Sequence, residues 1–273
     1  MRILIISNTD IEEVNEDFII AKSFEEDGCF VKIVNVDYDE ALDDCYDVFI
    51  KRNAYYEDEE LDLLVDKLSE RLKLKNKILI NFNGKYDSNG KKYLARLYEK
   101  GLSVIPSIDN IANLDKLPET NEYVLKKEDG YDGIGQQIIT KEEIEKKFKP
   151  GFILQPKIEF EKEVQFYFVN KIFCYALEFY PSKVPVYPDA KKYEYTNEEL
   201  CLAQRFANLN SNFIGIQRLD FLKRLDGELL LIEIEDSSPY LDLEELEKSD
   251  LDKFLKEYKN MIYTYIKKLD VKI

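Results

Sequence analysis

The chain is most constrained by the segment 212–241, which reads NFIGIQRLDFLKRLDGELLLIEIEDSSPYL. It contains two apolar runs, 213–222 and 228–234, on either side of the dipeptide Asp226-Gly227. An Asp-Gly pair between apolar runs is the strongest short-range signal for a β-hairpin. We therefore expect two antiparallel strands joined by a tight two-residue turn at this dipeptide.

The register of that hairpin gathers charged side chains. With the dipeptide as the turn, Asp220 lies opposite Glu233 and Arg218 opposite Glu235, and side-chain alternation puts all four on one face. Three carboxylates crowded on a pleated surface repel each other, and a hard divalent cation is the simplest compensation. Mg²⁺ suits such a cluster because it takes carboxylate oxygens and keeps waters and substrate phosphates, which implies a nucleotide. The alternative is a solvated face on which Arg218 pairs with a glutamate.

The charge of the chain restricts its partners. Among 273 residues, Lys plus Arg number 39 and Asp plus Glu number 55, so the net charge is −16. This balance argues against nucleic acid or an anionic membrane surface as the main partner, although a local basic pocket can still hold a phosphate. The length favours two or three subdomains over a single core.

Absent residue types exclude several kinds of chemistry. The chain has no histidine, which removes Ser-His-Asp and Cys-His catalysis, His-ligated zinc and imidazole bases. No apolar segment approaches the roughly 20 residues of a membrane span, and the N-terminus turns polar too soon for a signal peptide. The cysteines lack CxxC or zinc spacing and are expected to be reduced thiols of a soluble, cytoplasmic protein; they are Cys29, Cys45, Cys174 and Cys201.

The first 81 residues predict a small α/β unit. Helical periodicity covers 11–27, ending at Gly28, and 57–72. Strands are expected at 2–7, 31–36, 47–51 and 77–81. The strand-helix-strand order indicates a parallel sheet. No GxGxxG follows the first strand, so a dinucleotide site is not expected there.

Next come an expected short helix at 91–100 and strands at 122–127 and 152–158. Between those strands, EDGYDGIGQQII carries three glycines within a short span. Such a loop between strands is typical of a hairpin whose backbone N–H groups fold over phosphates, or of an ordinary flexible tip. Lys126 precedes the loop, where it would meet a phosphate or simply face outward.

The remaining segments predict a second hairpin and a long helix. Runs at 163–169 and 171–178 are expected strands joined across Asn170. Apolar residues recur at helical spacing between positions 251 and 266. We assign this amphipathic helix to packing.

These motifs together resemble the ATP-grasp superfamily over nearly the whole chain, most closely its glutathione-synthetase-like branch, which includes the ribosomal-protein glutamate ligases. The segment GKKYLARLYEKGLSVIPS is similar to that family's lysine, helix and Gly-x-x-x-x-Pro-Thr run, which places Lys91 on the first ATP lysine. Lys126 matches the second ATP lysine, and Gly130, Gly133 and Gly135 match the loop that covers the phosphates.

The same resemblance implies the residues around the nucleoside. The segment Gln155, Pro156, Lys157 and Ile158 would be the hinge that reads the adenine edge through backbone groups. Glu163 would accept hydrogen bonds from the ribose hydroxyls.

The hairpin itself corresponds to two strands of the family. GIQRLDFL matches the Arg-x-Asp strand, which implies that Arg218 is the catalytic, phosphate-stabilising arginine and that Asp220 is a magnesium ligand. LLLIEIEDSSPYLDL resembles the Glu-x-Glu or Glu-x-Asn strand with its following proline, so that Glu233 and Glu235 become the main metal ligands. The hairpin register selects these positions without the family.

Three positions depart from the family pattern. Lys127 stands where the family often has proline. An arginine often found in the strand after the ribose glutamate is Gln165 here, and a histidine of some relatives is Tyr175. The last two lie towards the acceptor side, so they concern the substrate rather than ATP binding.

The resemblance implies an α/β fold that is α+β in the ATP-binding part. A pre-ATP-grasp domain with a parallel sheet would cover 1–85, and a small subdomain with the lysine and glycine loop would cover 86–158. A large subdomain with the magnesium carboxylates and the C-terminal helix would cover 159–273. The implied cofactors are ATP and Mg²⁺, and the implied substrates are small molecules, amino acids or peptides. Relatives are often dimers or tetramers, so a homo-oligomer stays open.

The activity implied is ligation of a carboxylate to an amine through an acylphosphate, with release of ADP and phosphate. One alternative is a small-molecule kinase on the same fold, which stops after phosphoryl transfer. A second alternative is a non-catalytic nucleotide-binding protein.

Overall fold

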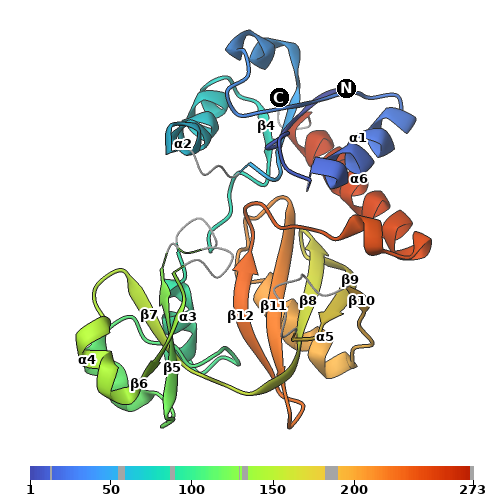
Figure 1. Cartoon of the computed structure of the whole chain (residues 1–273). Coiled ribbons are helices and arrows are strands. Elements are labelled where there is room, and N and C mark those ends of the chain that lie inside the picture. Colours follow the sequence, from blue (N-terminus) through green and yellow to red (C-terminus); the bar gives the residue numbers. More distant parts are fainter. Residues whose placement is uncertain are drawn as a thin grey trace.

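The computed structural model describes residues 1–12, 14–54, 59–86, 90–128, 130, 135–181 and 190–270. Its strands form three sheets, one in each of the three expected ranges (Figure 1). The boundaries of those ranges stay a prediction. Within the described residues, no helix is long and apolar enough to cross a membrane.

The N-terminal unit contains a parallel sheet, as its strand-helix-strand pattern predicts. Its strands have the order β2-β1-β3-β4, and β1 pairs in parallel with both β2 and β3. The apolar run of β1 is buried on both faces, as a parallel sheet requires. The elements are β1 (Arg2–Ile6), α1 (Val14–Glu26), β2 (Phe30–Val34), β3 (Val48–Lys51), α2 (Glu59–Leu74) and β4 (Ile78–Ile80).

The second unit is a three-stranded antiparallel sheet in the order β6-β5-β7. One face of α3 is buried through Tyr93, Leu94 and Leu97, the apolar positions that predicted the helix. The elements are α3 (Lys92–Glu99), β5 (Glu122–Lys127), β6 (Gln137–Thr140), α4 (Ile144–Lys147) and β7 (Phe152–Pro156). The described 3-10 helices of the chain are Glu40–Cys45, Ile111–Lys116, Lys141–Glu143 and Leu243–Glu245.

The third unit is a five-stranded antiparallel sheet in the order β10-β9-β8-β11-β12. The hairpin across Asn170 is confirmed as β8 and β9. Helix α5 was not foreseen, although Thr196 and Glu199 form a capping box at its start, a signal readable in the sequence. The elements are β8 (Phe160–Val169), β9 (Ile172–Phe179), β10 (Lys191–Lys192), α5 (Asn197–Ala207), β11 (Ile216–Arg224), β12 (Leu229–Glu235) and α6 (Lys248–Asp270).

The hairpin of β11 and β12 forms, but the expected two-residue turn is wrong. The Arg224 N–H donates to the Glu228 carbonyl, so three residues make the turn, and Gly227 adopts a φ of +89°. The pairing then shifts by one residue between Asp220 and Phe221, where a bulge adds a residue to β12. The two offsets cancel, and the expected register holds at the charged positions.

Helix α6 packs between the first and third units. Its buried residues Phe254, Tyr258 and Ile262 share one hydrophobic cluster with Ile3 of β1 and Tyr167 of β8. Figure 1 shows α6 crossing from the third unit to the side of α1. Removing a ring such as that of Phe254 would cost about 3–5 kcal/mol. The C-terminal helix therefore joins two units in one core, in agreement with its expected packing role.

The chain that leaves the first unit is attached to the start of β11. The Asn81 side chain donates to the Ile216 carbonyl at 2.8 Å and accepts from the Ile216 N–H at 2.9 Å. Gly215, which lies against it, has a φ of +154°, and an added Cβ would stand 2.3 Å from Asn81 Oδ1. Only glycine allows this approach. The carboxylate strand β11 is thus fixed at its first residue.

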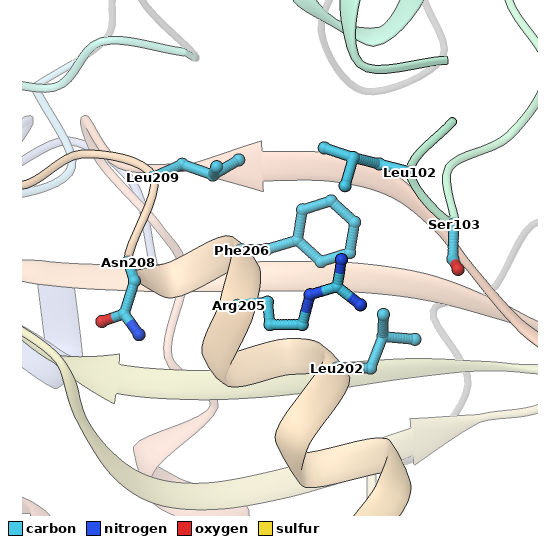
Figure 2. A pocket seen from close by; sticks show the side chains of 7 residues that line it. All are labelled: Leu102, Ser103, Leu202, Arg205, Phe206, Asn208 and Leu209. Carbon is cyan, nitrogen blue, oxygen red and sulfur yellow. The ribbon is translucent and has the colours of Figure 1, made fainter. Parts of the chain in front are cut away.

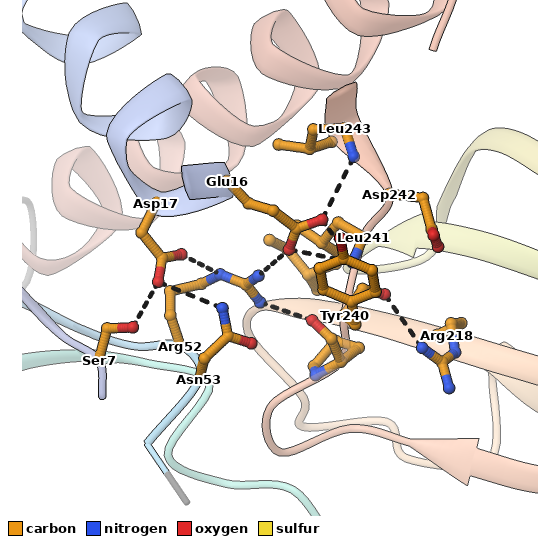
Figure 3. A network of polar contacts seen from close by, with 12 residues as sticks. Ser7, Glu16, Asp17, Arg52, Asn53, Arg218, Tyr240, Leu241, Asp242 and Leu243 are labelled. Carbon is orange, nitrogen blue, oxygen red and sulfur yellow. Dashed lines mark hydrogen bonds and ion pairs between the residues drawn. The ribbon is translucent and has the colours of Figure 1, made fainter. Parts of the chain in front are cut away.

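A buried ionic network lies where the first unit meets the segment after β12 (Figure 3). Arg52 is fully buried, and its guanidinium contacts Asp17 at 2.9 Å and Glu16 at 3.1 Å. Ser7 and Asn53 donate further hydrogen bonds to Asp17. One cation therefore meets two buried carboxylates, and burial raises the pKa of Glu16 from 4.5 to about 8 despite the attraction of Arg52.

The pKa of Glu16 makes stability depend on pH. A carboxyl whose pKa is higher in the folded than in the unfolded chain contributes stability that is fully present below the unfolded pKa and lost as the pH rises through the folded value. The window for Glu16 runs from 4.5 to about 8. Across that window, the unfolding free energy of Glu16→Gln should decrease by about 1–3 kcal/mol less than that of the unchanged protein. Urea unfolding of both proteins at several pH values measures this; parallel curves would contradict it.

Candidate functional site

The candidate site is one face of the β11–β12 hairpin. In the observed register Arg218 pairs with Glu235 and Asp220 with Glu233, as the sequence predicts. One carboxylate oxygen from each of the three acidic residues lies within 4.8 Å of the others. Asp220 is buried, whereas the two glutamates are partly exposed. The donors are all carboxylate oxygens, so the set fits a hard cation such as Mg²⁺.

Arg218 holds the acidic side chains on this face. Its Nε and Nη2 each donate to a different oxygen of Asp220 at 2.9 Å, a bidentate pairing. Nη2 also donates to Glu235 Oε1 at 2.6 Å, and Nη1 donates to the Tyr240 carbonyl at 3.2 Å. A planar guanidinium with several fixed donors is suited to this geometry.

Two lysines approach the hairpin face from the second unit. Lys91, at the N-terminal end of α3, forms an ion pair with Glu233. Lys126, on β5, is half-buried; burial lowers its pKa, Glu233 raises it, and Lys91 lowers it. Lys91 thus contacts Glu233 directly, and Lys126 interacts electrostatically with the same carboxylate. The cluster therefore contains residues from both units.

The charge of Asp220 is sensitive to its surroundings. Burial raises its pKa to about 7, while Arg218 lowers it and the carboxylates of Glu163 and Glu233 raise it further. Desolvation and like charges act in the same direction on a carboxyl group. A positive charge added at the cluster would therefore favour the ionised form of Asp220.

Glu163 lies at the start of the neighbouring strand β8. It accepts a hydrogen bond from Gln165 Nε2 at 3.1 Å, and Gln165 is the cross-strand partner of Asp220. Along the same face, Tyr167 lies opposite Arg218 and stacks on Tyr175 with ring centroids 4.3 Å apart. Two of the three departures from the family pattern, Gln165 and Tyr175, thus line the face that continues from the carboxylates.

The adenine hinge and the glycine loop are only partly described. The Gln155 side chain is buried and donates to Ser107 Oγ at 2.9 Å, and Lys157 Nζ pairs with Glu122 at 2.6 Å. Pro156 ends β7, and Ile158 is partly buried in the core. The Gln155 amide nitrogen and the Lys157 ammonium thus have partners within the second unit, and the reading of a base by the backbone of 155–158 stays a prediction. Gly130 and Gly135 flank the loop, and Gly133 lies outside the described residues.

Sequence reasoning missed residues that fix the site from outside. Asp236, directly after Glu235, is fully buried and accepts from the backbone N–H groups of Lys85 and Tyr86 at 2.7 and 3.1 Å. Lys51 Nζ donates to Ser237 Oγ at 2.5 Å. The acidic run IEIED marks this place in the sequence, but the partners are too distant along the chain to be read from it.

A cavity of about 310 Å³ lies elsewhere (Figure 2). Its lining includes Leu102, Arg205 and Phe206, and Phe206 packs on Phe221 with ring centroids 5.8 Å apart. Phe221 alternates with Asp220 along β11 and so points to the other face of the sheet. This cavity contains none of the predicted site residues, and we assign the chemistry to the hairpin face.

Comparisons with known proteins identify the fold. No sequence-family profile matches the chain, and no curated protein matches it by sequence. Solved structures do match. The D-cycloserine synthetase DcsG has a TM-score of 0.74 at 18% identity, covering 96% of this chain and 100% of that one. A RiPP-associated ATP-grasp ligase of Chryseobacterium gregarium, in complex with ADP and a leader and core peptide, has a TM-score of 0.68 at 16% identity, covering 97% of each chain.

A third similar structure is a D-alanine–D-alanine ligase of Bacillus anthracis complexed with ATP. It has a TM-score of 0.65 at 14% identity and covers 97% of this chain and 96% of that one. The chain therefore has the ATP-grasp fold, and the fold expected from its motifs is confirmed. The particular branch stays a prediction.

The cluster should bind a divalent cation. Mn²⁺, followed by electron paramagnetic resonance, is the probe, and Glu233→Gln and Glu235→Gln should each weaken its binding about tenfold or more because each removes a charged ligand. Glu228→Gln is the control, since Glu228 pairs with Arg224 at 2.7 Å at the tip of the same hairpin. Equal Mn²⁺ affinity in all three variants would mean that Arg218 and Lys91 alone compensate the carboxylates.

Proposed function

We propose that the protein is an ATP- and Mg²⁺-dependent ligase that joins a carboxylate to an amine through an acylphosphate. The single observation that carries the proposal is the hairpin face. There three carboxylates and one arginine meet two lysines from the neighbouring unit. This arrangement occurs on an ATP-grasp fold, whose similar structures include ligases described with ATP or ADP.

The reaction has two steps. A substrate carboxylate oxygen attacks the γ-phosphorus of ATP, and the bond to the β–γ bridging oxygen breaks, which releases ADP. The amine nitrogen of the second substrate then attacks the acyl carbon, and the carbon–oxygen bond to phosphate breaks. The amine loses a proton, and the products are an amide, ADP and phosphate.

Each charged residue has a place in this scheme. Asp220, Glu233 and Glu235 would hold Mg²⁺, which neutralises charge on the β- and γ-phosphates when bound. Lys91 and Lys126 would meet phosphate oxygens as point charges. Arg218, whose donors already form a planar fork, would stabilise the charge on the transferred phosphoryl group. Glu163 and the backbone of 155–158 would bind the nucleoside.

The absence of histidine is compatible with this chemistry. Phosphoryl transfer depends mainly on positioning and electrostatic stabilisation, so it needs no imidazole base. Proton removal from the amine then falls to a carboxylate, the departing phosphate or water. The absence of histidine would be a more serious obstacle to most hydrolases.

Nucleotide binding is the first test. MgATP at a hundredfold excess over its dissociation constant should stabilise the folded protein by about 2.7 kcal/mol. A thermal melt unchanged by millimolar MgATP would contradict nucleotide binding itself.

The products of the reaction are the second test. A panel of amino acids and short peptides, scored for release of ADP and phosphate, identifies the substrates. A stable phosphorylated acid as the product would favour the kinase. AMP and pyrophosphate as products would exclude the acylphosphate route.

Arg218→Lys tests the catalytic role of the hairpin. A point charge replaces a planar fork poorly, so kcat should fall by about a hundredfold or more while the dissociation constant of MgATP changes by a few-fold. Arg224→Lys is the matched control, because Arg224 is a partly exposed arginine near the tip of the same hairpin, paired with Asp226 and Glu228. Near-normal kcat in Arg218→Lys would mean that the hairpin face is structural.

A further inference from the structure

The segment 239–243, which follows β12, is held from two sides (Figure 3). From the third unit, Arg218 donates to the Tyr240 carbonyl at 3.2 Å, and Tyr175 donates through its hydroxyl to the Leu241 carbonyl at 2.6 Å. Tyr167 donates to the Asp242 carboxylate at 2.7 Å. Tyr175 thus binds backbone here and is buried, so this departure from the family pattern has a structural partner.

Two ionisable side chains of the N-terminal unit bind the same segment. Arg52 Nη1 donates to the Pro239 carbonyl at 2.9 Å. Glu16 Oε1 accepts from the N–H groups of Leu241 at 2.8 Å and Leu243 at 3.2 Å. Glu16 and Arg52 are both buried. Buried polar groups are costly unless bonded, so a network this complete fixes the geometry of the segment that it grips.

We propose that Glu16 and Arg52 are positioning residues for Arg218. They fix the segment 239–243, and the Tyr240 carbonyl in that segment orients the Arg218 guanidinium towards the reacting phosphoryl group. This inference rests on the proposed function. The N-terminal unit would then complete the catalytic geometry of the hairpin without contacting the nucleotide.

The proposal depends on which hydrogen bonds hold the Arg218 guanidinium in place. Asp220 and Glu235 hold Nε and Nη2, but a divalent cation at the carboxylates would compete for the same oxygens. The bond from Nη1 to the Tyr240 carbonyl is not exposed to that competition. It therefore stays available to keep the guanidinium in place. A displacement of about 1 Å in a catalytic group can cost about a hundredfold in rate.

Two substitutions at Glu16 distinguish its role as a hydrogen-bond acceptor from its role as a charged group. Glu16→Ala removes the acceptor of both amides and should lower kcat about tenfold or more, with KM for ATP within about twofold. Glu16→Gln keeps an acceptor oxygen and should retain most of kcat. Asp43→Ala is the control for lost stability, because Asp43 is a fully buried carboxylate of the same unit that pairs with Arg71 and Lys75 rather than with Arg52. Equal kcat losses in Glu16→Ala and Asp43→Ala, each measured per folded protein, would overturn the proposal.

A double-mutant cycle tests whether Glu16 acts through Arg218. In an Arg218→Lys background, Glu16→Ala should have little further effect on kcat, whereas additive losses would contradict the proposal. An activity-independent measurement distinguishes its failure from failure of the proposed function. Solvent exchange of the Arg218 Nε–H, followed by NMR, should be about tenfold faster in Glu16→Ala than in Asp43→Ala. Equal exchange rates would overturn the positioning role even if no substrate is found.

Discussion

Electrostatic crowding on the β11–β12 hairpin is the constraint on which the rest of the structure depends. Asp220, Glu233 and Glu235 lie together on a pleated surface, and burial of Asp220 makes its charge costly. Arg218 and Lys91 compensate that charge within the protein itself. In the proposed function, a divalent cation would add to this compensation when the nucleotide binds.

The surrounding units keep this face in place through buried polar contacts. Asn81 fixes the first residue of β11, and Asp236 fixes the chain just after β12. Glu16 and Arg52 grip the segment that follows. Each contact joins residues more than a hundred positions apart in the sequence. Buried polar groups contribute little net stability but strongly disfavour other arrangements when fully bonded, so they specify geometry more than they add stability.

These contacts also explain what the sequence could and could not predict. The hairpin register was predicted at Arg218 and Asp220 because charge and alternation are local, although the turn was wrong and a bulge corrected it. The start of helix α5 carries a local signal, the capping box of Thr196 and Glu199. The partners of Arg52 could not be predicted, because Glu16 and Asp17 look like ordinary acidic residues in the first turn of a surface helix. Only the tertiary fold shows that they are buried.

The ion pair between Lys91 and Glu233 joins the second and third units across the site. Each of its two charges would find a new partner in a magnesium-bound nucleotide. Breaking a partly buried pair is costly when one charge is left alone. Under the proposed function, a magnesium-bound triphosphate would offer phosphate oxygens to Lys91 and the cation to Glu233. Each charge would then exchange one partner for another of the same sign. The two residues that pair with each other across the units would thus be the ones that bind the phosphate and the metal.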